Sequence, residues 1–422
     1  MRDNKNENKN KRHCMVVHAY YPLGETRVER QALALVKHGY EVDVICLWAR
    51  KGPEFETRDG VNIYRLPVKR DKSGGSKAQL LEYLTFFVLA SRKLASLHWR
   101  HRYGTVQVHN LPDFLVFAGL IPKLMGAKLI LDIHDLMPEF YAARFKNSNW
   151  SSWPIRLIRW QEQISCRFAN KVITVTELWR NTLIQRGVPA EKVCVVMNVA
   201  DDRIFQRPSI NELSARNNDR FRLIYHGNIT QRYGIDSLVR AVNLVRYKIP
   251  NIHLMIHGGG DYRETLMKLV DELDLKEHVQ FSSGLLLPSS ELPNLIRTAD
   301  VGVVPYRRDI FTDGILPTKL MEYTALGVPS IVARTPAIEA YFDETMVEYF
   351  TPENVDELAA SILKLYDDPV HRATLAKNAD SFNQRYNWTK LSVEYVGLID
   401  ALHTQRARDI KQQEQEFNEK LI

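Results

Sequence analysis

The chain has 422 residues, of which 45% are hydrophobic, so it can form two or three domains with large cores. Its formal net charge of +7 favours acidic partners such as phosphates, nucleotides or an anionic membrane surface, without selecting one of them. The four cysteines lie far apart and form no C-x-x-C pair, which argues against a cysteine metal site and favours free thiols in a reducing compartment.

The N-terminal segment is polar and charged, and it has no apolar run of the kind that a signal peptide needs. The most apolar long segment, Leu80 to Leu97, is interrupted by Glu82, Arg92 and Lys93. No run of about 18 apolar residues is present, and therefore no transmembrane helix is expected. These features predict a cytoplasmic protein.

The first half of the chain alternates short apolar runs with longer amphipathic segments. Such an alternation of strands and helices is typical of a parallel sheet covered on both faces. The expected elements are, in chain order, a strand at 15–19, a helix at 26–38, strands at 41–47 and 61–66, a helix at 77–98, a strand at 105–109, a helix at 112–125, and strands at 128–133, 171–175 and 193–197.

The same alternation restarts after a polar stretch, 203–219, which is interpreted as a linker. Strands are expected at 222–226, 252–257, 279–281, 301–304 and 329–333, with helices between them. We therefore predict an α/β protein with two tandem Rossmann-like, doubly wound domains that face a central cleft. The expected divisions are a disordered tail at 1–12, an N-terminal domain at 13–202, a C-terminal domain at 203–385, and, at 386–422, a helix that returns to the N-terminal domain with a charged tail.

One stretch of the second half, Asp309 to Val332, suits a nucleotide-sugar. It is interpreted as a loop, a helix entered through Pro317, a turn at Gly327 and a buried strand. A helix N-terminus offers free N–H groups and the positive end of the helix dipole to an anion. Lys319 and Glu322 add a cation for phosphate and a carboxylate for sugar hydroxyls. The alternative is an ordinary crossover with solvated charges.

Other strand-end loops also carry candidate residues. Gly24 would let the backbone approach a ligand, or it marks a plain turn. His134 and Asp135 follow a buried strand, where they would contact a substrate or only cap the loop. Gly227 and Arg232 suit a phosphate, with a surface arginine as the alternative.

Three further segments are ambiguous. His109 ends another strand and would line the cleft or form a helix-capping turn. The segment His257-Gly-Gly-Gly-Asp261 matches neither G-x-G-x-x-G nor the P-loop pattern, so its signal is weak. The pair Asp201-Asp202 is better explained as linker than as metal ligands, and no metal site is expected.

Together these segments resemble the family 4 retaining glycosyltransferases, which have the two-Rossmann-domain glycosyltransferase-B (GT-B) fold. The resemblance extends over residues 14–400. It is carried, in order, by Asp132-Ile-His-Asp135, Val193–Asp201, His226-Gly-Asn-Ile229, Ala299–Pro305 and Leu316–Pro329.

The resemblance implies a role for each matching position. Glu322 matches the second glutamate of the family's E-x7-E motif and would bind the ribose. His134 matches the histidine beside the reacting sugar, and Gly24 the glycine loop near the donor diphosphate. The other residues expected at the donor site are Gly227, Arg232, Gly314, Leu316 and Lys319, with His109 and Asp135 on the acceptor side.

The chain departs from the family pattern at two positions. Gly314 stands where the first glutamate of E-x7-E is expected, and the adjacent Asp313 is the candidate substitute. Asn228 replaces the usual arginine after the strand-end glycine, so Arg232, alone or with Lys319, must supply the cation for the diphosphate.

The implied activity is transfer of a sugar from a nucleotide diphosphate sugar to an acceptor hydroxyl with retained anomeric configuration. His134 and Asp313 are the expected catalytic residues. The acceptor would be a glycan or a lipid-linked saccharide, in the synthesis of a cell-surface polysaccharide or glycolipid. We expect no metal, no cofactor besides the donor substrate and no nucleic-acid partner. Two alternatives are a nucleotide-sugar epimerase and a catalytically weak nucleotide-sugar-binding subunit.

Two basic and aromatic segments, 97–103 and 150–160, fit either an anionic membrane surface or packing against the sheet. A peripheral membrane contact suits a lipid-linked acceptor, and it would place the protein at the inner face of the membrane.

Overall fold

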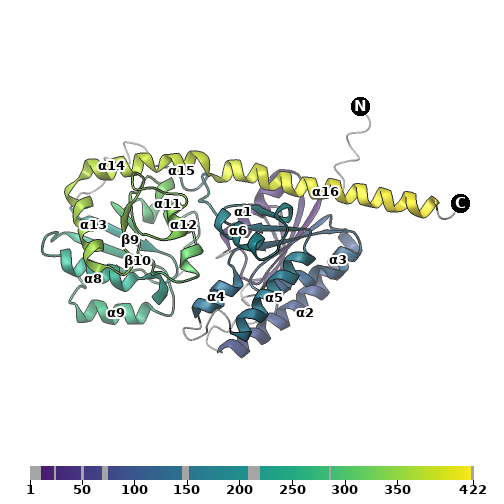
Figure 1. The fold of residues 1–422 in the computed structure, drawn as a ribbon, viewed down its shortest axis with the longest axis horizontal. Helices are drawn as coiled ribbons and strands as arrows, with labels where there is room; N and C mark the ends of the chain where they lie inside the picture. The colour runs from purple at the N-terminus through teal and green to yellow at the C-terminus, as the bar shows by residue number, and fades with distance from the viewer. Residues whose placement is uncertain are drawn as a thin grey trace. The chain divides into compact units, whose positions relative to one another are not determined.

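The computed structural model of the chain contains two compact units (Figure 1). Unit 1 comprises residues 1–197 with 390–422, and unit 2 comprises residues 198–389. Gly24, Trp150 and most of both the expected tail and the expected linker lie outside the described residues. The structure describes residues 11–22, 25–48, 52–68, 75–144, 152–207, 219–284 and 287–419.

The described part of unit 1 forms an eight-stranded sheet in the order β3-β4-β2-β1-β5-β6-β7-β8. Only β3 pairs antiparallel, along the edge with β4. The short β3 was not expected, because it is largely exposed and has no apolar run. The strands are β1 Arg12–Val17, β2 Glu41–Leu47, β3 Phe55–Arg58, β4 Val61–Leu66, β5 Thr105–His109, β6 Lys128–Ile133, β7 Lys171–Thr174 and β8 Val193–Val195.

Helices cover both faces of this sheet. The single helix expected at 112–125 was wrong, because the segment divides into a 3-10 helix, η2, and a short α-helix, α3. Gly119 at the junction and Pro122 within α3 are both poor residues for a helix interior. The helices of unit 1 are α1 Thr26–Lys37, α2 Gly75–His101, η2 Asp113–Gly119, α3 Leu120–Leu124, α4 Met137–Arg144, α5 Trp153–Phe168, α6 Glu177–Gln185 and η3 Ala190–Lys192.

A long C-terminal helix, α16 (Trp388–Glu419), is bound to unit 1 through buried and half-buried polar contacts. The Tyr395 hydroxyl donates to Gln107 Oε1 at 2.7 Å, and the Tyr40 hydroxyl donates to Asp400 Oδ1 at 2.6 Å. The helix continues to Glu419 and so includes most of the charged tail that was expected to follow it.

Unit 2 contains, among its described residues, a six-stranded parallel sheet in the order β11-β10-β9-β12-β13-β14. The prediction of an α/β protein with two parallel, doubly wound sheets is confirmed. The strand β14 was not expected, because it contains a glutamate and only one of its side chains is fully buried. The strands are β9 Phe221–His226, β10 Ile252–His257, β11 Val279–Phe281, β12 Val301–Val304, β13 Ser330–Ala333 and β14 Glu348–Phe350.

The connections of unit 2 are mostly helical. They are η4 Gln231–Tyr233, α8 Ile235–Val245, α9 Arg263–Glu272, α10 Leu292–Ile296, η5 Thr312–Gly314, α11 Thr318–Ala325, α12 Pro336–Glu339, α13 Val355–Asp367, α14 Pro369–Asn378 and α15 Asp380–Arg385. Across the described residues of both units, none of the helices has the length and apolar character needed to span a bilayer.

Replacing Tyr395 by Phe is expected to lower the free energy of unfolding by about 1 kcal/mol, because the buried Gln107 oxygen loses a hydrogen-bond donor. Urea denaturation measures the loss. Val393→Ala on the same helix is the control, because Val393 is 63% exposed and should change stability by less than about 0.5 kcal/mol. Equal effects of the two substitutions would contradict the anchoring role of Tyr395.

Candidate functional site

The sheet of unit 2 has a point where its connections diverge. The helix α8 leads from β9 to β10, whereas α11 leads from β12 to β13 on the opposite side of β9. Ligands of doubly wound sheets bind at the carboxyl ends of strands beside such a point. His226 ends β9 there, Tyr306 follows β12, and α11 brings Lys319 and Glu322 to the same place.

The Glu322 carboxylate is held in place by a histidine. Its Oε2 atom lies 2.5 Å from His226 Nε2, and His226 Nδ1 lies 3.0 Å from the Tyr323 hydroxyl. His226 thus links the Glu322 carboxylate to Tyr323, whose hydroxyl also donates to the Ile224 carbonyl at 3.3 Å. The Glu322 side chain stays 17% exposed, so the fixed carboxylate can accept further hydrogen bonds from a ligand.

Lys319 is buried among aromatic rings. Its amine donates to the Tyr306 hydroxyl at 2.9 Å and lies 4.8–5.0 Å from the ring centres of Tyr225, Tyr233 and Tyr306. Burial lowers the pKa of Lys319 to about 7, although the nearby Glu322 acts in the opposite direction. An anion that docks beside this amine would favour its protonated form.

Glycines bring backbone close to Lys319. A Cβ on Gly227 would lie 3.4 Å from Lys319 Cε, and Gly227 itself has a left-handed φ of 114°. The glycine run after β10 packs directly on this turn, because a Cβ on Gly258 would lie 1.9 Å from the Gly227 oxygen. The ambiguous segment at 257–261 therefore has a structural reason for its glycines.

The other residues expected at the donor site have varied surroundings. Arg232 lies in η4, with its guanidinium 5.1 Å from the ring centre of Phe311. Asp313 forms an ion pair with Arg308, at 2.7 and 2.9 Å, so its carboxylate is engaged outside the Glu322 network. Gly314 and Leu316 are buried in the segment that leads into α11.

In unit 1, a buried carboxylate lies under the carboxyl ends of β5 and β6. Arg27 donates to both oxygens of Asp132, at 2.9 and 3.2 Å, and Gln31 and Gln107 donate to Oδ2 at 3.1 and 2.9 Å. Burial alone would raise the pKa of Asp132, but the Arg27 charge holds it well below its ordinary value. The sequence patterns pointed to none of Arg27, Gln31 and Gln107 as site residues.

Two expected site residues of unit 1 are brought together above this carboxylate. The Nδ1 atom of His109 lies 3.0 Å from Nε2 of His134. Burial lowers the pKa of His109 to about 4, so that its ring is neutral at pH 7, whereas the His134 side chain is 20% exposed. Asn110 joins the strand ends, since its Oδ1 accepts from the His134 N–H and its Nδ2 donates to the Asp135 carbonyl.

His109, Asp132 and His134 are also the residues of the described chain whose ligand atoms are close enough to hold a metal, within 4.8 Å of one another. A divalent cation there would compete with the Arg27 guanidinium for the Asp132 oxygens. The arrangement therefore fits a hydrogen-bonded histidine pair better than a metal centre. The pair Asp201-Asp202 is engaged elsewhere, with Arg203 and Thr389 respectively.

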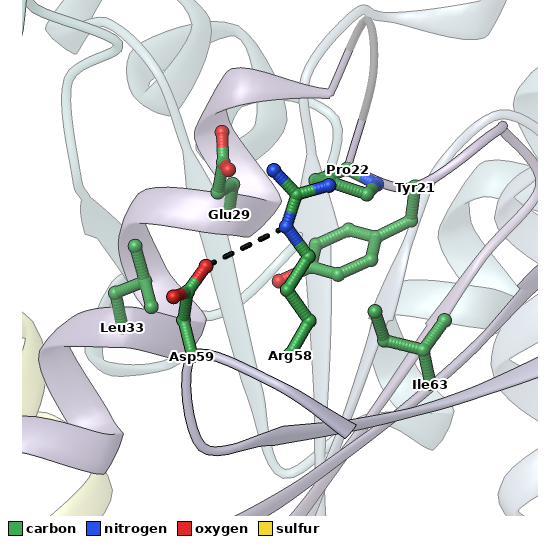
Figure 2. Close-up of a pocket in the computed structure, with 7 residues that line it drawn as sticks. All are labelled: Tyr21, Pro22, Glu29, Leu33, Arg58, Asp59 and Ile63. Carbon is green, nitrogen blue, oxygen red and sulfur yellow. Dashed lines mark ion pairs between the residues drawn. The ribbon is translucent and has the colours of Figure 1, made fainter. Parts of the chain in front are cut away.

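A small pocket lies beside the loop that follows β1 (Figure 2). Arg58 reaches over Tyr21, and its Nε atom pairs with Asp59 at 3.6 Å. Glu29 of α1 adds a second carboxylate to the lining. The cation of this pocket is thus already paired, and the lining includes none of the described residues expected at the donor and acceptor sites.

Comparison with known proteins identifies the family. Residues 24–198 match the Glycosyl transferase 4-like domain, and residues 206–382 match Glycosyl transferases group 1. The chain belongs to the family 4 glycosyltransferases. The predicted family and its GT-B fold are thereby confirmed.

Individual glycosyltransferases are similar over nearly the whole chain. The chitobiosyldiphosphodolichol beta-mannosyltransferase of Candida albicans is 24% identical over 90% of this chain and 87% of that protein. The sucrose-phosphate synthase of Thermosynechococcus elongatus has the same fold, with a TM-score of 0.74, 18% identity, and coverage of 93% of this chain and 100% of that one. HepE of Anabaena, solved in complex with UDP, has a TM-score of 0.67, 16% identity, and coverage of 92% and 100%.

The buried amine of this glycosyltransferase makes the stability of unit 2 depend on pH. Between pH 7 and the ordinary lysine pKa of 10.5, the unfolded chain binds a proton at Lys319 that the folded chain does not, so stability rises with pH. Lys319→Met is expected to remove about 1 kcal/mol per pH unit of this rise between pH 7 and 9, measured by urea denaturation.

The control is Lys364→Met, because Lys364 is exposed and pairs with Glu348 at 2.8 Å. It should leave the slope of stability against pH as in the unmodified protein. Parallel slopes for the Lys319 variant and the unmodified protein would contradict a neutral amine at Lys319.

Proposed function

We propose that the protein transfers a glycosyl group from a nucleotide diphosphate sugar to an acceptor hydroxyl, with retention of the anomeric configuration. The observation that carries this proposal is the placement of Glu322 and Lys319 beside the Gly227 turn in unit 2. A fixed carboxylate suits the ribose hydroxyls, and a buried amine suits the diphosphate. The complex of the similar Anabaena protein with UDP supports a nucleoside diphosphate as the bound group.

In the proposed reaction, the bond between the anomeric carbon and the diphosphate oxygen breaks, and its electron pair stays on the diphosphate. Lys319, Arg232 and the N–H groups at the start of α11 stabilise the charge that develops there. The acceptor oxygen bonds to the same face of the anomeric carbon, and its proton passes to the departing phosphate. His134 contacts the reacting sugar, and His109 and Asp135 lie on the acceptor side.

The acceptor in this proposal is a glycan or a lipid-linked saccharide, and the product belongs to a cell-surface polysaccharide or glycolipid. The Candida relative is named for a dolichol-linked substrate, which supports this class. The reaction is also proposed to need no metal, because Lys319 and Arg232 supply positive charge for the diphosphate and Arg27 already occupies the Asp132 oxygens.

The purified protein is expected to release a nucleoside diphosphate from one donor in a panel of uridine, guanosine and adenosine diphosphate sugars, and only when an acceptor is present. EDTA should leave the rate unchanged, since protein cations stabilise the leaving group. A coupled assay measures the release, and NMR of the product gives its anomeric configuration.

Each alternative has its own outcome in this assay. Interconversion of the donor sugar without an acceptor would support an epimerase, and nucleotide binding without turnover would support a catalytically weak subunit. An inverted product would overturn retention. Activity lost in EDTA and restored by Mn²⁺ would overturn metal independence.

Replacing Glu322 by Gln is expected to weaken binding of the nucleoside diphosphate by about 10- to 100-fold, because hydrogen bonds to a charged carboxylate contribute about 1.5–3 kcal/mol. Isothermal titration calorimetry measures the Kd. Glu339→Gln is the matched control, since Glu339 is exposed, pairs with Arg334, and should leave the Kd unchanged. Equal affinity of the Glu322 variant and the unmodified protein would show that Glu322 does not bind the nucleoside diphosphate.

A substitution of Asp313 distinguishes binding of the nucleotide from recognition of the donor sugar. We propose that it replaces the missing first glutamate by releasing Arg308 when a donor sugar binds. Asp313→Ala should then lower kcat/KM at least tenfold while the Kd of the nucleoside diphosphate stays the same. Unchanged KM and kcat would show that Asp313 does not replace that glutamate.

A further inference from the structure

The helix α2 of unit 1 has an outward stripe of large apolar side chains. Leu81, Leu84 and Val88 are 67%, 46% and 44% exposed, and they follow one another at helical spacing. Lys77 and Arg92 continue the same stripe at its two ends, and both are exposed. The outward face of α2 is thus apolar at its centre and basic at its ends.

The helix α5 has an outward face of the same kind. Trp153, Leu157 and Trp160 are 75%, 53% and 58% exposed. Arg156 and Arg167, on the same helix, are exposed between and beyond them. Tryptophan and arginine side by side on one helix face are typical of helices that lie in a membrane interface.

Neither helix presents a carboxylate on its described surface. The acidic residue of α2, Glu82, has a side chain only 7% exposed and lies 3.0 Å from His18. The acidic residue of α5, Glu162, is 1% exposed and lies 2.9 Å from Arg186. The two outward faces therefore carry apolar groups and positive charge, which is complementary to an anionic surface.

The two faces belong to one side of unit 1. The crossovers from β4 to β5 through α2 and from β6 to β7 through α5 run in the same direction across the sheet, and right-handed crossovers place both helices on the same face. Both helices pack against η2, where Phe87 of α2 contacts Phe114 at 5.9 Å between ring centres. Figure 1 shows α2 and α5 together on one side of the sheet of unit 1.

Of the two segments considered from sequence, 97–103 is partly buried, and Arg100 and Arg102 are exposed. Leu97, His98 and Tyr103 are buried, whereas Trp99 is exposed and lies 5.2 Å from Arg102. In the described part of the segment 150–160, Ile155 is buried, Ile158 is half-buried, and Trp153, Leu157 and Trp160 are exposed. The exposed apolar stripe of α2 that accompanies the outward face of α5 lies before the segment 97–103, at Leu81, Leu84 and Val88.

We propose that the outward faces of α2 and α5 form a docking surface for an anionic lipid membrane. The apolar side chains of both helices enter the boundary between headgroups and acyl chains, and the flanking cations contact the lipid phosphates. The surface lies entirely within unit 1, so it acts independently of the donor residues of unit 2.

The test is flotation of the full chain with vesicles of phosphatidylcholine, with and without phosphatidylglycerol. The protein is expected to bind the anionic vesicles at least tenfold more strongly and to be released by added salt. The double substitution Leu157→Glu and Trp160→Glu should lower this binding at least tenfold. Because both residues are exposed, the variant should keep its unfolding midpoint and its affinity for the nucleoside diphosphate.

Val393→Glu is the matched control, since Val393 is 63% exposed on another helix of unit 1 and should leave vesicle binding unchanged. Equal binding to both kinds of vesicle, or equal binding by the double variant, would overturn the proposal. The proposal would also be overturned if no vesicle binding were detected and sedimentation equilibrium showed a dimer that the double variant abolishes. A failed transfer assay with intact vesicle binding would count against the proposed function alone.

Discussion

Parallel sheets covered by helices on both faces leave few places for polar side chains, because the strand interiors must be apolar. In both units, those places are the carboxyl ends of the central strands. The backbone ladder ends there, and the loops carry histidines and glycines. This constraint explains why the candidate residues cluster at His134 in unit 1 and at His226 in unit 2, although most buried side chains of both sheets are apolar.

The two clusters handle buried charge in opposite ways. In unit 1, the Asp132 carboxylate accepts hydrogen bonds from Arg27 and from two side-chain amides, which hold it in a fixed position beneath the histidine pair. In unit 2, burial among tyrosine rings lowers the pKa of Lys319 to about 7, so an anion that docks beside the amine would favour its charged form. The first arrangement orients side chains, whereas the second is suited to binding.

The departures of the chain from its family's pattern occur in unit 2. The backbone carbonyl of Asn228, where an arginine is usual, accepts a hydrogen bond from Tyr225, one of the rings around Lys319. The turn that lacks its arginine is thus built around a lysine from another element. Lys319 is therefore the residue best placed to compensate for the missing positive charge. Asp313, the candidate substitute for the missing glutamate, is paired with Arg308.

The sequence by itself determined the fold class, the family and most strands, because alternating apolar runs and ordered strand-end motifs are local patterns. It also singled out Glu322, Lys319, His109 and His134. Only the tertiary structure decided what surrounds them, because His226, Tyr306 and Arg27 come from elements far along the chain. The sequence likewise showed that segments of α2 and α5 are apolar and basic. Which of their residues face outward depends on how each helix packs on η2, and only folding sets that.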